Sequence, residues 1–335
     1  MSGAVVETQK VLEIQKLHHW FGPKLVLHDI NLEIARGQIV SIVGPSGCGK
    51  STLFRAIIGT HPPRRGEIVV THPDGSQDPV RGPGRDRGIV YQNYALFEFL
   101  TVLDNVAFGP MLDETTPMDR WFRRGFWKEL RKKHHEKAYA LLERVGLAAA
   151  AERYPHELSG GMRQRVAIAQ ALIMEPDVLL LDEPFGALDE ATREDLQRLL
   201  LQLYADNVTA LQEGRPQDAR TILMVTHELT EAIFVSDRVV GLSQYLDWNA
   251  AGHKEHPGAT VVYDKAARVY NPDDAKQHED FVKQREELHH AVFDTENLQR
   301  HDAFVEFWHN VYAGARVGVL DDGAPDAALD GASDP

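Results

Sequence analysis

The stretch GPSGCGKST at residues 44–52 places glycines, a lysine and hydroxyl side chains in the order that binds phosphate groups. It follows an apolar run at 38–44 that is typical of a buried strand, and a helix is expected from near Lys50. Glycines let backbone N–H groups face phosphate oxygens, and the start of a helix adds partial positive charge. We expect Lys50 to bridge the β- and γ-phosphates of a nucleotide and Ser51 to coordinate Mg²⁺. The nucleotide-binding residues predicted here are Gly44, Pro45, Ser46, Gly47, Cys48, Gly49, Lys50, Ser51 and Thr52.

The acidic counterpart is the stretch VLLLDEP at 178–184. Its apolar run predicts a buried strand that ends in two adjacent carboxylates, at the edge where open α/β sheets bind ligands. Because successive strand residues point to opposite sides, Asp182 and Glu183 need different roles. We expect Asp182 to hold the Mg²⁺ shell and Glu183 to polarise the attacking water as general base.

A third stretch, LSGGMRQR at 158–165, predicts a second anion site that has no lysine. Ser159 can cap a helix, while Gly160 and Gly161 can expose backbone N–H groups. The chain thus carries two parts of a nucleotide site, far apart in sequence. These two parts meet either within one molecule or between two.

The elements that must position these residues are strands that alternate with helices. Apolar and β-branched runs predict strands at 25–35, 38–44, 66–70, 87–91, 177–184, 220–228 and 237–243. A mostly helical region is predicted between them, from about 101 to 174. This alternation predicts an α/β fold whose sheet is interrupted by a helical insertion.

The composition is that of a globular protein with an acidic end. Of the 335 residues, 43% are hydrophobic and 26% are charged, and no apolar run approaches the roughly 18 residues that span a bilayer. The N-terminus has no signal-peptide pattern, and the single cysteine, Cys48, suits a reducing cytosol. Residues 245–335 hold 18 Asp and Glu against 8 Lys and Arg, so they carry −10 of the net charge of −14. A global basic footprint for nucleic acid is therefore missing.

In these motifs the chain resembles the nucleotide-binding subunit of an ABC transporter, over residues 5–244 or so. LSGGMRQR is similar to that family's signature, which closes on the ATP held by the other subunit's phosphate loop. The resemblance therefore implies two chains, head to tail, that share two sites. It assigns Gln92, in VYQN, a contact with Mg²⁺ and the γ-phosphate, and Asp189, in GALDE, a place at the dimer interface. His227, in VTHE, would contact the γ-phosphate and orient the water, although a histidine alone is more often a satisfied core residue.

The resemblance also implies the domain organisation. A P-loop ABC ATPase domain is expected at 1–244, with an antiparallel β-subdomain and a helical subdomain at about 93–175. A mainly helical, acidic extension is expected at 245–335. The family stacks an aromatic ring on adenine near WFG at 20–22; Phe21 has the better spacing and Trp20 is an equally good ring. The alternative for either ring is that it closes the small β-subdomain.

Longer stretches around the same motifs indicate the class of transporter. GMRQRVAIAQAL, DEPFGALDEATR and VTHELTEAIFVSDRVV are similar to importer ATPases of the nitrate, sulfonate, taurine and bicarbonate group. That resemblance implies ATP hydrolysis coupled to solute uptake at the cytoplasmic face of the inner membrane. The implied partners are a second ATPase subunit, identical or not, transmembrane permease subunits and, indirectly, a solute-binding protein; no nucleic acid is expected. The rivals are a soluble ABC ATPase acting on nucleic acid or ribosomes, and a metabolic P-loop kinase, which would not need LSGGMRQR.

Three segments depart from the family pattern, and the extension has no assigned motif. Glu98 stands where proline is common, near the permease docking site. The segment 111–137 is longer than usual, and its basic cluster is open to three interpretations: a solvated helix face, phospholipid head groups or an acidic permease loop. Residues 205–220 are expected to form a surface excursion. In the extension, helices are expected at 273–293 and 297–313 and a disordered end at 321–335. The extension is interpreted as a solvated appendage, a regulator of the dimer or a permease-docking element.

Overall fold

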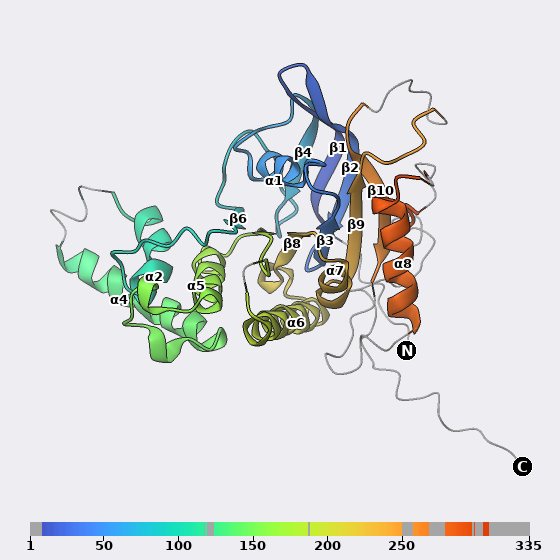
Figure 1. Cartoon of the computed structure of the whole chain (residues 1–335). Coiled ribbons are helices and arrows are strands. Elements are labelled where there is room, and N and C mark those ends of the chain that lie inside the picture. Colours follow the sequence, from blue (N-terminus) through green and yellow to red (C-terminus); the bar gives the residue numbers. More distant parts are fainter. Residues whose placement is uncertain are drawn as a thin grey trace, which may run out of the picture.

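The computed structural model describes residues 9–116, 118, 124–186, 188–249, 257–267, 279–296, 298 and 304–307. Two β-sheets lie together, with one group of helices at one end and helix α8, Glu279–Phe293, at the other (Figure 1). The predicted α/β class, with an antiparallel sheet and a helical part, is confirmed by this architecture.

The smaller sheet is antiparallel and has the strand order β2-β1-β4-β5. Its inward side chains alternate with outward ones, as expected for a sheet with one face on the core; in β2 the buried residues include Leu32 and Ile34. The predictions at 25–35 and 66–70 are confirmed, whereas β1 was missed. The strand bounds are β1 Lys10–Phe21, β2 Lys24–Ala35, β4 Arg65–Thr71 and β5 Gln77–Pro79.

The larger sheet has the strand order β10-β9-β3-β8-β7-β6. Strands β9, β3, β8, β7 and β6 are parallel, and β10, at one edge, runs antiparallel against β9. Strands β3, β8 and β9 are buried along their whole length, because helices cover one face of the sheet and the antiparallel sheet with α1 covers the other. This burial on both faces is why they are apolar without alternation. The bounds are β3 Ile39–Val43, β6 Arg87–Val90, β7 Val178–Asp182, β8 Thr221–Thr226, β9 Arg238–Ser243 and β10 Thr260–Ala266.

The helices fall into two groups. The region predicted to be mostly helical forms α2 Val102–Asp113, α4 Arg124–Arg144 and α5 Gly160–Leu172, which share their own apolar core (Figure 1). The helices beside the larger sheet are α1 Lys50–Ile58, α6 Glu190–Gln212 and α7 Leu229–Val235. Short 3₁₀ turns occupy Ala148–Ala150, Pro155–Glu157 and Pro216–Asp218.

The surface excursion predicted at 205–220 is wrong in its first half, because α6 continues through Gln212. The side-chain amide of Asn207 is buried and donates hydrogen bonds to the carbonyl oxygens of Gly37, at 2.9 Å, and Arg220, at 2.6 Å. Those bonds hold the last turns of α6 against the sheet. Asn207 therefore stabilises the packing of α6 on the sheet.

The extension continues the larger sheet. Strand β10 was not predicted, and α8 Glu279–Phe293 packs on β9 and β10; it overlaps the helix expected at 273–293, whose first residues lie outside the described ones. The helix expected at 297–313 is wrong at 304–306. There the carbonyl of Phe304 accepts from the N–H of Asp264, at 2.8 Å, and the N–H of Glu306 donates back to Asp264, at 3.0 Å, so the chain is extended. Most other residues of that stretch, and the end at 321–335, lie outside the described residues.

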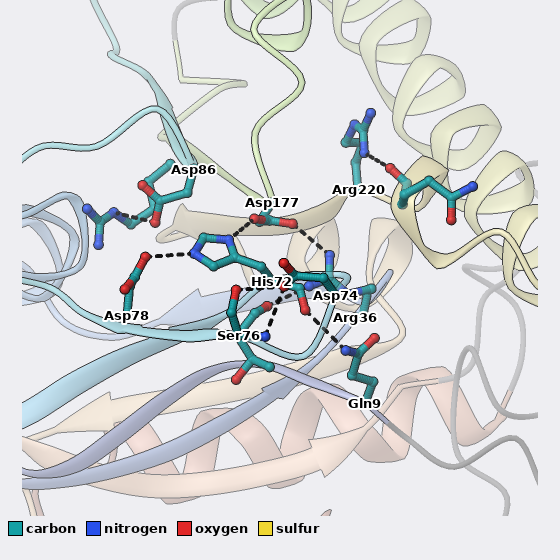
Figure 2. Close-up of polar contacts among 12 residues, drawn as sticks. Gln9, Arg36, His72, Asp74, Ser76, Asp78, Asp86, Asp177 and Arg220 are labelled. Atoms are coloured by element: carbon teal, nitrogen blue, oxygen red, sulfur yellow. Dashed lines mark hydrogen bonds and ion pairs between the residues drawn. The ribbon is translucent and has the colours of Figure 1, made fainter.

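A polar cluster joins the two sheets at the start of β7. The ring of His72, which follows β4, lies between two carboxylates (Figure 2). Its Nδ1 is 2.8 Å from Asp177, and its Nε2 is 3.2 Å from Asp78. Arg36 donates to the other oxygen of Asp177, at 2.8 Å, and to the carbonyl of Thr71. The carboxylate of Asp177 thus fixes the antiparallel sheet to the start of β7 in the larger sheet.

Candidate active site

The phosphate-binding loop lies between β3 and α1. Gly47 and Gly49 both take positive φ, which favours glycine, and Gly49 is the N-cap of α1. A Cβ on Gly44 would lie 2.2 Å from the carbonyl oxygen of Leu242, so only glycine fits where the loop passes β9. The Lys50 ammonium donates to the carbonyls of Gly44, at 2.7 Å, and Pro45, at 3.0 Å. The loop predicted from the sequence thus connects a buried strand to a helix, and phosphate binding by it stays a prediction.

The two adjacent carboxylates differ in environment, as their predicted roles require. Asp182, the last residue of β7, is half-buried; burial raises the pKa of its carboxyl group, the charge of Glu183 raises it further, and Arg55 and Lys50 lower it. Glu183 follows in the left-handed region, at φ 48°, and its N–H donates to the carbonyl of Val225 at 2.9 Å.

Three of the predicted residues meet at Glu183. The amide nitrogen of Gln92 donates to Oε2 of Glu183 at 3.2 Å, and Nδ1 of His227 lies 3.6 Å from Oε1. These side chains come from the ends of β6, β7 and β8, which neighbour one another in the sheet. The side chain of His227 is 51% exposed, so it is not a core histidine.

The signature residues begin a helix of the other group. Ser159 is the N-cap of α5, and its hydroxyl accepts from the N–H of Met162 at 3.3 Å, which confirms the predicted cap. Asp189 caps α6 in the same way, accepting from the N–H and hydroxyl of Thr192 at 3.0 and 2.9 Å. Those hydrogen bonds hold the pKa of the exposed Asp189 carboxyl below its usual range.

The signature and the phosphate loop begin different helices, α5 and α1. Helix α5 packs on α2, α4, α6 and β6, whereas α1 packs on β2, β6 and β7 (Figure 1). Both helices contact β6, but α5 also shares an apolar core with α2 and α4. The head-to-tail arrangement of two chains stays a prediction.

The aromatic rings predicted for adenine both end β1. Phe21 is 45% exposed and lies edge-on to His19, with ring centroids 5.1 Å apart. Trp20 is half-buried and stacks on His18 at 5.8 Å. Phe21 is therefore the more exposed of the two rings.

Sequence reasoning missed two neighbours of the site. Arg55 is close enough to lower the pKa of Asp182, and its position on the helix that starts at Lys50 was a usable signal. Tyr94 has positive φ, at 61°, two residues after Gln92, and its ring lies under the guanidinium of Arg163 on α5, 5.6 Å away. Nothing in the sequence pattern indicated that contact.

Comparisons with known proteins identify the family of the chain. The family profile described as ABC transporter matches residues 27–186. The chain is similar to the sulfate/thiosulfate import ATP-binding protein CysA of Pectobacterium atrosepticum, with 41% identity over 75% of this chain and 70% of that protein. It is also similar to the taurine import ATP-binding protein TauB of Escherichia coli K12, with 40% identity over 70% and 80%, and of Roseobacter denitrificans, with 36% over 81% and 87%.

Two solved structures resemble the fold at 26% sequence identity. One is cbiO1 of Clostridium perfringens, part of an ABC transporter complex, with a TM-score of 0.57 over 84% of this chain and 96% of that one. The other is a dimeric ATP-binding cassette in a post-hydrolysis state with ADP and Pi, with a TM-score of 0.54 over 77% and 100%.

Fold and site together define a nucleotide-hydrolysing P-loop protein. The chain belongs to the ABC transporter family, as an ATP-binding and ATP-hydrolysing subunit of an importer. The alternative of a soluble ATPase acting on nucleic acid or ribosomes is not favoured. None of the helices within the described ranges combines the length and hydropathy that a bilayer span needs.

Proposed function

We propose that this chain hydrolyses ATP with Glu183 as the general base, and so powers uptake of a small anion or zwitterion of the sulfate, sulfonate, taurine, nitrate or bicarbonate type. The observation that carries the chemistry is the meeting of Gln92, Glu183 and His227. The solute class rests on the names of the relatives, two of which import taurine and one sulfate or thiosulfate.

The chain's own residues divide the reaction between them. The Glu183 carboxylate accepts the proton of the attacking water, while His227 orients that water and contacts the γ-phosphate. As the water oxygen bonds to the γ-phosphorus, the bond to the β,γ-bridging oxygen breaks and its electron pair leaves with ADP. Lys50 balances the phosphate charge, and Phe21 stacks on the adenine.

The residues at the loop also fit Mg²⁺. The Ser51 hydroxyl, the Gln92 amide oxygen and the Asp182 carboxylate are all oxygen donors, which this cation prefers. Lys50 and Arg55 act on the pKa of Asp182, so its carboxylate lies near the start of α1, where Ser51 stands. When bound, Mg²⁺ supplies a charge that neutralises the phosphate oxygens.

The complete site takes two chains. Ser159, Gly160 and Gly161 of one chain would contact the ATP held by the other, and Asp189 would lie across their interface. ATP binding would join the two ATPase subunits, and hydrolysis would release them. The motion would pass to permease subunits at the cytoplasmic face of the inner membrane, where a solute-binding protein delivers its cargo from outside.

The substitution Glu183→Gln tests the chemistry. We expect turnover to fall about 10²–10⁴-fold, because the base is removed while the phosphate loop stays intact. ATP affinity should be retained, and the variant should accumulate as an ATP-bound dimer in gel filtration. Glu194→Gln, on an exposed part of α6, is the matched control. Normal turnover in Glu183→Gln would refute the assigned role.

Stimulation of the ATPase tests the solute. With the permease in proteoliposomes, the rate should rise when the solute-binding protein carries taurine, sulfate or another anion of this group. Equal rates with loaded and empty binding protein for every such anion would exclude the proposed class.

A further inference from the structure

A charged contact lies between the first turns of α6 and α7. Nε of Arg193, whose side chain is 33% exposed, is 3.1 Å from Oε1 of Glu231, whose side chain is 9% exposed. Arg193 stands four residues after Asp189, and Glu231 stands four residues after His227. The ion pair therefore connects the element that follows the predicted interface loop to the element that follows the predicted γ-phosphate histidine.

Glu231 also reaches the residue just before His227. The hydroxyl of Thr226, at the end of β8, lies 3.5 Å from Oε2 of Glu231 as a donor and accepts from the N–H of Glu228 at 3.1 Å. The buried threonine hydroxyl thus bridges both sides of the loop that carries His227. The position of that loop depends on where the Glu231 carboxylate is held.

The Glu231 carboxylate is held in place by the charge of Arg193. Burial raises the pKa of Glu231, and the charge of Arg193 lowers it. Removing the arginine would leave a buried carboxylate with no opposite charge beside it, which is costly. In response, the side chain would protonate or swing toward water, and either change would weaken its contact with Thr226.

The far end of this connection is the signature. Thr192, next to Arg193, contacts Asp189 through its hydroxyl and crowds Gly161 through its methyl group; a Cβ on Gly161 would lie 1.5 Å from Cγ2 of Thr192. The first turn of α6 therefore touches a signature glycine on one side and, through Arg193 and Glu231, the His227 loop on the other.

We propose that Arg193 is a positioning residue for ATP hydrolysis: through Glu231 and Thr226 it holds His227 beside Glu183. The first turn of α6 also contacts Gly161, so the same pair links the surface facing the partner's nucleotide to the histidine facing the chain's own. This inference rests on the proposed function of His227.

The test compares ATPase kinetics of Arg193→Met, Arg193→Lys and Glu231→Gln in the full chain. For Arg193→Met and Glu231→Gln we expect kcat to fall about 10- to 100-fold, because a small displacement of a reacting group costs that much. KM for ATP should stay within about twofold, because the phosphate loop is untouched. Arg193→Lys keeps the charge and should restore most of kcat. Arg198→Met, which removes an exposed pair with Glu194 on the same helix, is the matched control.

A double variant separates positioning from stability. In Arg193→Met with Glu231→Met, apolar groups replace the buried pair, which commonly preserves stability. We expect its melting temperature to return toward that of the unmodified protein while kcat stays low, because Thr226 has lost its partner. If kcat returns together with the melting temperature, the pair is merely structural and the inference is overturned.

His227→Ala distinguishes this inference from the function on which it rests. If His227→Ala is inactive while Arg193→Met turns over normally, only the positioning role fails. If His227→Ala itself turns over normally, the proposed role of His227 is wrong and the positioning role falls with it.

Discussion

The neighbouring acids Asp182 and Glu183 differ in backbone conformation. Asp182 ends β7 with strand geometry, and Glu183 adopts φ 48°, which is uncommon for a residue with a side chain. The hydrogen bond from its N–H to Val225 fixes the turn onto β8, the strand that carries His227. The base and the histidine are therefore set by the same pair of strands.

Gly161 is where a single methyl group should interfere with the shared site. Adding a Cβ in Gly161→Ala forces Thr192 to move, because their carbon atoms would be 1.5 Å apart. We expect a loss of about 1–3 kcal/mol from overpacking and weaker ATP-dependent dimerisation, measured by melting temperature and by light scattering with ATP. Gly125→Ala on α4, where nothing lies within 4 Å of the added carbon, is the control. Unchanged dimerisation in Gly161→Ala would show that the contact with Thr192 does not matter to the interface.

At the scale of elements, the extension belongs to the core. Arg238 of β9 is fully buried and binds both carboxylate oxygens of Asp264 in β10, each at 2.7 Å, while Phe307 lies 3.9 Å from its guanidinium carbon. The Ser243 hydroxyl donates to the carbonyl of Val292 in α8 at 2.7 Å. Every residue predicted to handle phosphate precedes residue 244, whereas the packed core of the domain includes residues of the extension.

A chain ending at Ser243 should therefore fail to fold stably. It would remove the Asp264 carboxylate and the Phe307 ring from Arg238 and would expose the apolar surface of β9 that α8 covers, and both losses are costly. Solubility and the thermal unfolding transition measure this outcome. A chain ending at residue 313 keeps every described contact and should melt like the full chain. A soluble, cooperatively melting chain ending at Ser243 would show that the extension is an appendage.

The His72 cluster predicts how stability changes with pH. The hydrogen bond to Asp177 raises the pKa of His72, Asp78 adds to the rise and burial opposes it. A histidine whose folded pKa is raised stabilises the fold below its unfolded pKa of about 6.5, and this contribution is lost as pH rises through the folded value. His72→Gln should therefore lower the urea midpoint more at pH 5.5 than at pH 8.5. His61→Gln, outside the cluster, is the control; an equal loss at both pH values would contradict the linkage.

The buried strands were predictable because burial on both faces demands long apolar runs, as in β3, β7 and β8. Strand β1 was harder, since several register shifts interrupt its alternation. Strand β10 was hidden by the acidic, histidine-rich sequence around it. In the site, the residue types were readable from motifs, whereas the meeting of Gln92, Glu183 and His227 depends on strand order.

At the scale of the whole molecule, the arrangement of the two motifs decides how many chains make a site. The phosphate loop lies between β3 and α1, whereas the signature begins α5, which packs with α2 and α4 (Figure 1). A second chain turned head to tail would place each signature on the other chain's phosphate loop. Each dimer would then have two equivalent sites, and every site would depend on residues from both chains.

Mixing two inactive chains tests that arrangement. Lys50→Ala removes the ammonium held by the phosphate loop, and Ser159→Arg replaces the cap of α5 with a bulky cation. In a mixed dimer, one site carries both changes and the other carries neither, so ATP-dependent dimerisation should return when the variants are combined. Labelled chains followed by energy transfer with ATP measure it, and each variant alone is the control. Hydrolysis need not return if both sites must act in one cycle, so association is the deciding measurement. A mixture that associates no better than either variant alone would mean that each chain completes its own site.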